Sequence, residues 1–325
     1  MRIAVDAMGG DNAPGCVVEG VASALAAFPQ IEKVFLSGDE GALKKLVDGA
    51  GLPLGRVEIL PASQVVEMGD PATASIRSKK DSSITVAVDA VKRGDAQAVV
   101  SAGHTGAAVA ATTVKLRLLE GIRRPGIASP LPNDHGICNI LDAGANVDAK
   151  PHHLLQYGIM GTVYAQHVLR VDNPRIGLMS VGEEDGKGND FTKQVFALLK
   201  ETPLNFIGNV EGHDLFEKHL DVVLCDGFVG NAVLKSCEAT AKIMFKWLKA
   251  EFTRTPIRKL GAYLSRDAFR ATKAKGDYEN YGGSPLLGVN GICVICHGSS
   301  SSVAIHNALR VAADAVAHEV NPQIE

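Results

Sequence analysis

Short apolar runs alternate with amphipathic stretches along most of the chain, and this alternation predicts its secondary structure. Runs such as RIAVD (2–6) and KVFLS (33–37) have the length and composition of buried strands, and turn residues follow them. The predicted strands are 2–6, 33–37, 57–60, 96–101, 136–142, 175–180, 221–225 and 291–296. The predicted helices are 15–28, 39–50, 82–93, 105–119, 152–169, 189–201, 229–250 and about 300–319.

Strands that alternate with helices favour an α/β fold, in which a Rossmann-like, doubly wound and mostly parallel sheet carries helices on both faces. The chain has 325 residues, 46% of them hydrophobic, which is enough for a large core. Neither an internal repeat nor a linker divides the sequence. We therefore expect residues 1–325 to form a single α/β unit.

The chain begins MRIAVDAMGGD, which lacks the apolar stretch and cleavage site of a signal peptide. Uninterrupted apolar runs all fall short of the roughly 18 residues that indicate a membrane-spanning helix. These features predict a cytoplasmic protein.

The letters CVICH (293–297) match the attachment motif of a c-type haem. Such a haem is normally attached after export, and the stretch GICVIC is typical of a buried strand. The adjacent pair His152 and His153 would point in different directions on a helix, which disfavours a metal site. We predict no bound metal or cofactor.

Basic residues are concentrated between Lys242 and Lys275, where ten of them face only Glu251 and Asp267. This segment carries +8, and because the whole chain carries −3, the remainder carries −11. Two interpretations stay open: ordinary surface helices, or a basic amphipathic segment at about 239–276 that contacts anionic lipid or an acidic protein. The residues predicted to make that contact are Trp247, Lys249, Arg254, Arg258, Leu260, Leu264 and Arg266. Nucleic acid is not a predicted partner.

The loops after the predicted strands are rich in Gly, Asp, Asn and hydroxyl residues. Ligands of open α/β sheets bind at the carboxyl ends of strands, and backbone amides at helix N-termini bind anions. We therefore expect six such loops to share one edge of the sheet and to bind phosphate or a developing oxyanion. The candidate binding residues are Asp6, Gly9, Gly10, Asp11, Ser101, Thr105, Asp142, Asn146, Asp226, Gly227, His297, Gly298, Ser299 and Ser300.

Common catalytic motifs are missing from the sequence: no Gly-x-Gly-x-x-Gly follows the first strand, and there is neither a Walker A motif nor a Gly-x-Ser-x-Gly elbow. Among the loop residues, Lys187 and His104 have the most useful side chains for chemistry. From the residues alone, we predict a phosphate-handling transferase or a phosphate-ester binder.

Seven ordered motifs resemble those of the bacterial acyl-acyl-carrier-protein:phosphate acyltransferases. They are DAMGGDNAP (6–14), SAGHTGA (101–107), LDAGAN (141–146), GNVEGHD (208–214), DGFVGN (226–231), YGGSPLLG (281–288) and HGSS (297–300). The resemblance runs from Asp6 to the last predicted helix. Members of the family often have Asn where this chain has His104, so the chain departs from the family pattern at this position.

The resemblance implies an acyltransferase that converts acyl-acyl-carrier protein and inorganic phosphate to acyl phosphate and free carrier protein, in phospholipid biosynthesis. It also implies a fold like the isocitrate and isopropylmalate dehydrogenases, a homodimer, and a peripheral membrane protein. Its product would pass to a membrane-embedded glycerol-3-phosphate acyltransferase. No cofactor is implied.

For this reaction, we hypothesise that Lys187 balances the charge of phosphate or of the oxyanion, while His104 and Asn231 donate hydrogen bonds. Ser299, Ser300 and the amides of Gly9 and Gly10 would hold phosphate, and Asp142 and Asp226 would orient donors.

Three alternatives remain. A phosphate acetyltransferase-like enzyme would use short acyl-coenzyme A, which the basic segment disfavours. A metal-dependent hydroxy-acid dehydrogenase would need clustered Asp ligands and a dinucleotide motif. A non-catalytic scaffold for carrier protein would have no use for an anion site.

Overall fold

The computed structural model describes residues 1–53, 55–276 and 278–324. Its strands are β1 (Arg2–Asp6), β2 (Lys33–Gly38), β3 (Val57–Pro61), β4 (Ala98–Ser101), β5 (Gly126–Asn133), β6 (Gly136–Leu141), β7 (Ile176–Met179), β8 (Phe206–Val210), β9 (Val222–Leu224), β10 (Ser284–Leu287) and β11 (Ile292–Ile295). Among the described residues these form one continuous eleven-stranded sheet in the order β3-β2-β1-β4-β11-β10-β5-β6-β9-β7-β8.

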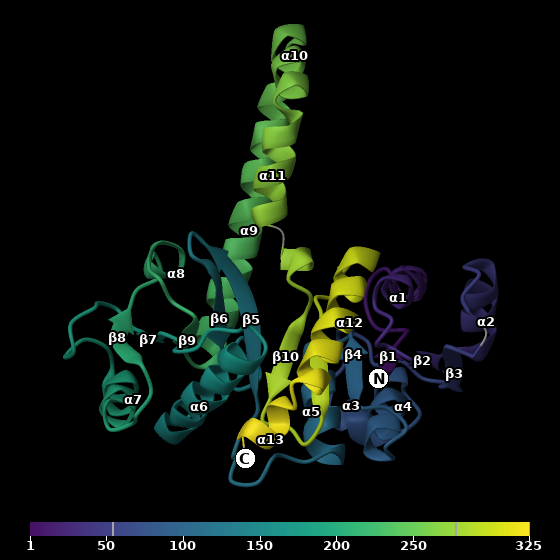
Figure 1. The fold of residues 1–325 in the computed structure, drawn as a ribbon, viewed down its shortest axis with the longest axis horizontal. Coiled ribbons are helices and arrows are strands. Elements are labelled where there is room, and N and C mark those ends of the chain that lie inside the picture. Colours follow the sequence, from purple (N-terminus) through teal and green to yellow (C-terminus); the bar gives the residue numbers. More distant parts are fainter. Residues whose placement is uncertain (54, 277, 325) are drawn as a thin grey trace.

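Helices cover both faces of this sheet (Figure 1). They are α1 (Gly15–Ala27), α2 (Glu40–Gly49), α3 (Ala72–Ser78), α4 (Ser83–Lys92), α5 (Thr105–Lys115), α6 (Pro151–His167), α7 (Asp190–Lys200), α8 (Asp214–Glu217), α9 (Gly227–Phe252), α10 (Pro256–Leu264), α11 (Arg266–Gly276), α12 (Ser302–Ala317) and α13 (Val320–Ile324), with a 3₁₀ turn at Tyr278–Asn280. The predicted α/β class is confirmed. That residues 1–325 act as a single unit stays a prediction.

Most neighbouring strands in the described sheet are parallel, as predicted, but the strand direction reverses in its middle. The three antiparallel pairs are β10 with β11, β10 with β5, and β5 with β6. Three reversals leave β6, β9, β7 and β8 pointing opposite to β1, β4 and β11. The expectation that all six loops share one edge of the sheet is therefore wrong.

The reversal was missed because neither β5 nor β10 was predicted. Strand β5 reads GIASPLPN, and its two prolines disfavour a central strand. They are tolerated because β10 pairs only with Gly126 and Ile127, so the edge of β5 that faces β10 is unpaired near Pro130 and Pro132. Strand β8 and the short helices α3 and α8 were also missed.

Alternating residues of the central strands enter separate cores on the two faces of the sheet. Val294 on β11 and Cys296 directly after it pack with residues of α1 and α12, while Cys293 on β11 packs with residues of α4 and α5. Burial raises the pKa of both thiols to about 12. The two cysteines thus lie in a buried strand, as predicted, and face opposite cores, where one metal or haem cannot bind both.

The basic segment forms a hairpin of α9, α10 and α11 that projects from the body of the protein (Figure 1). No residue of α10 or α11 is buried. Trp247, Leu260 and Leu264 are 62%, 60% and 74% exposed. Across the hairpin, the rings of Phe252 and Phe269 pack edge to face with centroids 4.9 Å apart.

Some basic side chains of the hairpin pair with its few acids. Arg254 and Arg258 both contact Glu251, and Arg266 lies near Asp267. The Arg266 guanidinium also stacks on the Tyr263 ring, with Cζ 4.9 Å from its centroid. Searched over the described residues, the helices include none with the length and apolar composition needed to cross a membrane.

Candidate active site

Two neighbouring strand ends form the base of the candidate site. Strands β1 and β4 are parallel, and Asp6 lies beside Ser101. The Ser101 hydroxyl donates to Asp6 Oδ2 at 2.7 Å, and the backbone N–H of Gly103 donates to Ser101 Oγ at 3.1 Å. These bonds join the loop after β1 to the loop after β4.

Glycines allow the backbones of three loops to touch. A Cβ atom on Gly9 would lie 2.7 Å from the backbone N of Gly103. Gly10 has φ +108°, and its Cβ atom would lie 3.0 Å from the carbonyl O of Gly298. Asp11 N donates to the same carbonyl at 2.7 Å. We call the loops 6–11, 101–104 and 297–300 together the cradle.

The loop 297–300 leads into α12 without a side-chain cap. Ser299 N donates to His297 Nδ1 at 3.1 Å, and the Ser299 hydroxyl lies 2.8 Å from the same nitrogen. Ser301, at the N-cap position, instead donates its hydroxyl to Glu279 Oε2 at 2.6 Å. The first-turn amides of this 16-residue helix therefore lack a side-chain acceptor, an arrangement that favours a bound anion.

His104 caps the helix that begins at the cradle. Its Nδ1 accepts from Ala107 N at 3.2 Å at the start of α5. Because Nδ1 is an acceptor, the proton of the neutral ring lies on Nε2, which is free to donate to a ligand. Thr105 follows it as an exposed first-turn residue.

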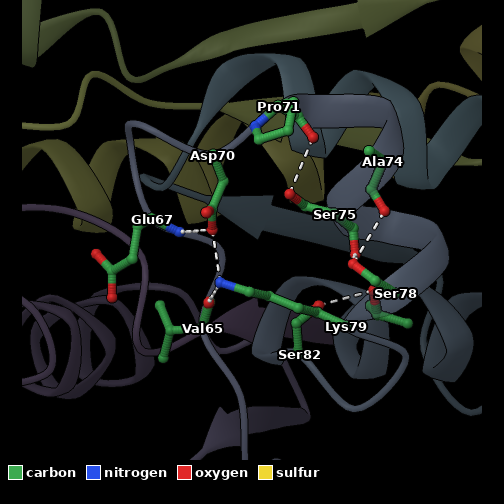
Figure 2. A network of polar contacts seen from close by, with 10 residues as sticks. Val65, Glu67, Asp70, Pro71, Ala74, Ser75, Ser78, Lys79 and Ser82 are labelled. Atoms are coloured by element: carbon green, nitrogen blue, oxygen red, sulfur yellow. Dashed lines mark hydrogen bonds and ion pairs between the residues drawn. The ribbon is translucent and has the colours of Figure 1, made fainter.

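The loop before α3 borders the cradle through Met68, and Figure 2 shows the polar contacts of this loop. The Lys79 ammonium donates to Asp70 Oδ2 at 2.5 Å and to the Val65 carbonyl at 2.8 Å, which fixes this loop. That bond from Lys79 is the main cause of a lowered pKa at Asp70. Met68, from the same loop, covers Gly298: a Cβ atom on Gly298 would lie only 2.5 Å from Met68 Cε. The sequence pattern held no signal for this contact.

Two further side chains reach the cradle from α9 and were not predicted. Glu238 Oε2 lies 3.8 Å from His297 Nε2, and Lys235 Nζ lies 3.1 Å from the same Glu238 oxygen. Helix α9 therefore passes the cradle midway along its length. A charged pair at i and i+3 in a helix is common on surfaces, so the sequence alone did not single it out.

Asp6 is buried and only partly satisfied. Its Oδ2 accepts from Ser101, whereas Oδ1 has no hydrogen-bond partner within the described part of the chain. Burial is the main cause of a raised pKa at Asp6, and the neighbouring Ser83 and Ser101 side chains oppose it.

A second cluster forms around Asp142, which follows β6, a strand that runs opposite to β4. Asp142 Oδ1 accepts from the backbone N–H groups of Ile127 and Ala145 at 3.0 and 2.9 Å. Its Oδ2 accepts from Asn146 N at 2.7 Å, and the Asn146 amide bonds the Tyr157 hydroxyl. Asp142 is 0% exposed, so its carboxylate organises the loop and has no capacity left for a ligand.

The start of α9 packs against this second cluster. Asp226 Oδ1 caps α9 by accepting from Val229 N at 2.9 Å. A Cβ atom on Gly227 would lie 2.8 Å from the Asn146 carbonyl O, and one on Gly230 would lie 1.9 Å from the Asp142 carbonyl O. Asn231 is exposed and lies beside Gly144.

Lys187 lies apart from both clusters. It is exposed on the loop after β7, and its backbone N donates to the Glu184 carbonyl at 2.9 Å. Within the described residues, no contact joins its side chain to another predicted site residue. Its loop belongs to the half of the sheet whose strands point away from the cradle.

One group of residues in the described part of the chain has the geometry to hold a metal ion, with ligand atoms of Glu183, His213 and Asp214 within 4.8 Å of one another. The Lys218 ammonium already binds this group, at 2.8 Å from Glu183 and 3.2 Å from Asp214. The bond to Glu183 is the main cause of a raised pKa at Lys218. This group is an ion-pair network without a link to the cradle.

The histidine pair predicted to mark a helix start does so. His153 Nδ1 accepts from Lys150 N at 3.0 Å, at the beginning of α6. Burial is the main cause that lowers the pKa of His153 to about 4. This histidine is therefore neutral and structural near pH 7.

Known proteins of two kinds are similar to this chain. Phosphate acyltransferases of Akkermansia muciniphila and Pelotomaculum thermopropionicum are 54% and 48% identical to it, over 100% and 97% of this chain and 95% and 92% of theirs. A solved phosphotransacetylase from Streptococcus pyogenes has a TM-score of 0.63 at 16% identity, over 98% of this chain and 94% of its own.

A branched-chain phosphotransacylase structure from Enterococcus faecalis has a TM-score of 0.61 at 14% identity, over 98% and 99% of the two chains. At such identities the structures show a shared fold alone. The family model described as fatty acid synthesis protein matches residues 1–323. Together with relatives about half identical over the whole length, this match shows that the chain belongs to the fatty acid synthesis protein family.

Proposed function

We propose that the chain is a phosphate acyltransferase of phospholipid synthesis. It transfers an acyl group from the thioester of acyl-acyl-carrier protein to inorganic phosphate, and releases acyl phosphate and free carrier protein. The observation that carries this proposal is the cradle, where glycine backbones meet at the uncapped start of α12. The names of the relatives support the same activity.

The reaction needs positioning more than a covalent intermediate. A phosphate oxygen attacks the thioester carbon, a C–O bond forms, the C–S bond breaks, and the thiolate takes up a proton. Holding phosphate and thioester in attack geometry supplies several kcal/mol of the barrier reduction. Each well-placed donor to the oxyanion contributes about 3 kcal/mol. His104 Nε2–H is such a donor, and it is a proton source for the thiolate.

The other predicted catalytic residues are less directly placed. Asn231 lies beside Gly144 at the start of α9, and Lys187 lies on the loop after β7. The contacts join neither side chain to the cradle. Their catalytic roles therefore stay predictions.

The projecting hairpin supports contact with an anionic surface. Exposed Trp247, Leu260 and Leu264 stand among basic side chains such as Lys249, a composition typical of helices that bind at lipid interfaces. We propose that the protein acts in the cytoplasm as a peripheral membrane protein. A membrane-embedded glycerol-3-phosphate acyltransferase would take up its product. The same surface suits an acidic carrier protein.

A homodimer is proposed from the groove along the hairpin. The groove, about 1260 Å³ in volume, is lined by apolar residues of α9 and α11 such as Leu234, Phe245, Phe252 and Phe269. A monomer would leave this surface in water, whereas a second copy would cover it.

A second candidate is a phosphate acetyltransferase-like enzyme that uses short acyl-coenzyme A, and the fold shared with phosphotransacetylases favours it. One assay separates the two. Purified protein is mixed with palmitoyl-acyl-carrier protein or acetyl-coenzyme A, with and without phosphate, and the product is trapped with hydroxylamine. We expect phosphate-dependent hydroxamate from the carrier-protein substrate. Hydroxamate from acetyl-coenzyme A alone would contradict the proposal.

A further inference from the structure

A chain of polar contacts runs from α9 into the cradle. Lys235 Nζ lies 3.1 Å from Glu238 Oε2, which lies 3.8 Å from His297 Nε2. On the other side of the imidazole ring, His297 Nδ1 lies 2.8 Å from the Ser299 hydroxyl. Glu238 therefore links a lysine to the histidine that opens the loop 297–300.

The hydrogen bonds set the tautomer of His297. Ser299 N donates to Nδ1 at 3.1 Å, so Nδ1 is an acceptor and the proton of the neutral ring lies on Nε2. Nε2–H then faces the carboxylate of Glu238, whose side chain is only 11% exposed. A largely buried carboxylate without a positive or donor partner is costly, and here it has both.

Charges from two elements act on His297. Burial is the main cause of its lowered pKa; Lys235 and Lys242 of α9 lower it further, while Glu238 of the same helix and Asp11 of the loop after β1 raise it. Near pH 7 the neutral ring is favoured, which keeps Nδ1 available as an acceptor for Ser299.

We propose that Lys235 and Glu238 belong to the phosphate site: Lys235 supplies positive charge to the bound phosphate, and Glu238 is a positioning residue that orients both Lys235 and His297. This proposal rests on the proposed function and adds residues to its site. It also assigns the charge-balancing role to Lys235, which Glu238 links to His297, in place of Lys187 on the loop after β7. The Lys235 side chain is 46% exposed, so phosphate has access to it.

Three variants and two control variants test the proposal, each in the full-length protein. Lys235→Ala and Glu238→Gln remove the two charges, and Lys235→Arg restores a cation. Glu40→Gln and Lys44→Ala are matched controls, because both residues are exposed on α2, at the end of the sheet away from α9. The readouts are kcat, the KM for phosphate and the KM for palmitoyl-acyl-carrier protein.

We expect Lys235→Ala to raise the KM for phosphate at least tenfold and the KM for acyl-acyl-carrier protein less than twofold, with partial recovery in Lys235→Arg. Glu238→Gln should raise the KM for phosphate about fivefold. It should also move the acid limb of the pH–rate profile to lower pH, because removing the Glu238 charge lowers the pKa of His297 further. An unchanged KM for phosphate in both variants, at normal melting temperatures, would overturn the proposal.

A binding measurement separates this proposal from the proposed function. Inorganic phosphate raises the melting temperature of a protein that binds it in the folded state. If the wild type makes no acyl phosphate but is stabilised by phosphate, and Lys235→Ala is not, the activity is wrong and the phosphate site stands. If the wild type makes acyl phosphate and Lys235→Ala is stabilised equally by phosphate, the activity stands and the role of Lys235 is wrong.

Discussion

Two loop clusters use the same kinds of residue for different purposes. Around Asp142 and Asp226, the carboxylates accept from backbone N–H groups, and glycines let α9 pack against the loop. In the cradle, by contrast, the start of α12 lacks a side-chain cap and His104 keeps a free donor. Residue type therefore does not separate a structural loop from a binding loop; what matters is whether the protein itself satisfies the polar groups.

The largest effect is expected from filling a close contact in the second cluster. Gly230→Ala places a methyl group where a Cβ atom lies 1.9 Å from the Asp142 carbonyl O, so the start of α9 must move. We expect a loss of more than about 4 kcal/mol in the free energy of unfolding, measured by urea denaturation. Gly261→Ala is the control, since nothing lies within 4 Å of that Cβ, and it should gain up to about 1 kcal/mol.

The next largest effect is expected at Asp142. In Asp142→Asn, an amide NH₂ group replaces an acceptor and faces a buried N–H donor, which should cost about 3 kcal/mol of stability. Asp226→Asn should change stability by less than about 0.5 kcal/mol, since Asn caps helices as well as Asp does. Equal losses of stability in the two variants would mean that Asp142 contributes no more to stability than the helix cap Asp226 does.

A cradle residue should show the opposite pattern, with activity lost and stability kept. His297→Ala removes the acceptor that orients Ser299, and we expect kcat/KM for phosphate to fall about 100-fold. The free energy of unfolding should change by less than about 1 kcal/mol. His306→Ala on α12 is the control, because His306 contacts Ser23 and lies outside the cradle. Retained activity in His297→Ala would remove the contrast between the two clusters.

The smallest effect is expected at Asp6. Its raised pKa means that the folded state holds the proton more tightly than the unfolded state, so this residue's contribution to stability falls as pH rises from about 4 through the folded pKa. Asp6→Asn should abolish that fall and change stability by at most about 1 kcal/mol at neutral pH. Urea denaturation of both proteins between pH 4 and pH 7 gives the difference. If the free energies of unfolding of the two proteins differed by the same amount at every pH in this range, the pKa of Asp6 would not be raised in the folded state.

Much of the local structure was predictable from the pattern alone. The apolar runs at 2–6, 33–37 and 57–60 became β1, β2 and β3 with nearly the predicted bounds. For β1 and β2 the reason is that buried parallel strands are short and strongly apolar. Strands β5 and β10 were missed, since β5 contains two prolines and neither has a distinctive alternation. These two strands are also the ones that reverse the sheet.

The site was partly predictable for the same reason. Loops rich in glycine were recognised as close backbone contacts, and Gly9, Gly10 and Gly298 do meet in the cradle. Glu238 and Lys235 lie on a long helix, roughly 60 residues before His297 in the chain, and their contact with it depends on how α9 crosses the sheet. No local pattern encodes that crossing.

The sequence by itself determined the α/β class, the family, the buried strand at Cys293 and the basic amphipathic segment, because each depends on residues close together in the chain. Only the tertiary structure decided which strands run in opposite directions and which loops meet in the cradle. Strand direction is set by pairing between distant segments, where packing and hydrogen bonding are satisfied across the whole sheet. Residue types that were equivalent in the sequence thereby became a structural cluster around Asp142 and a candidate active site in the cradle.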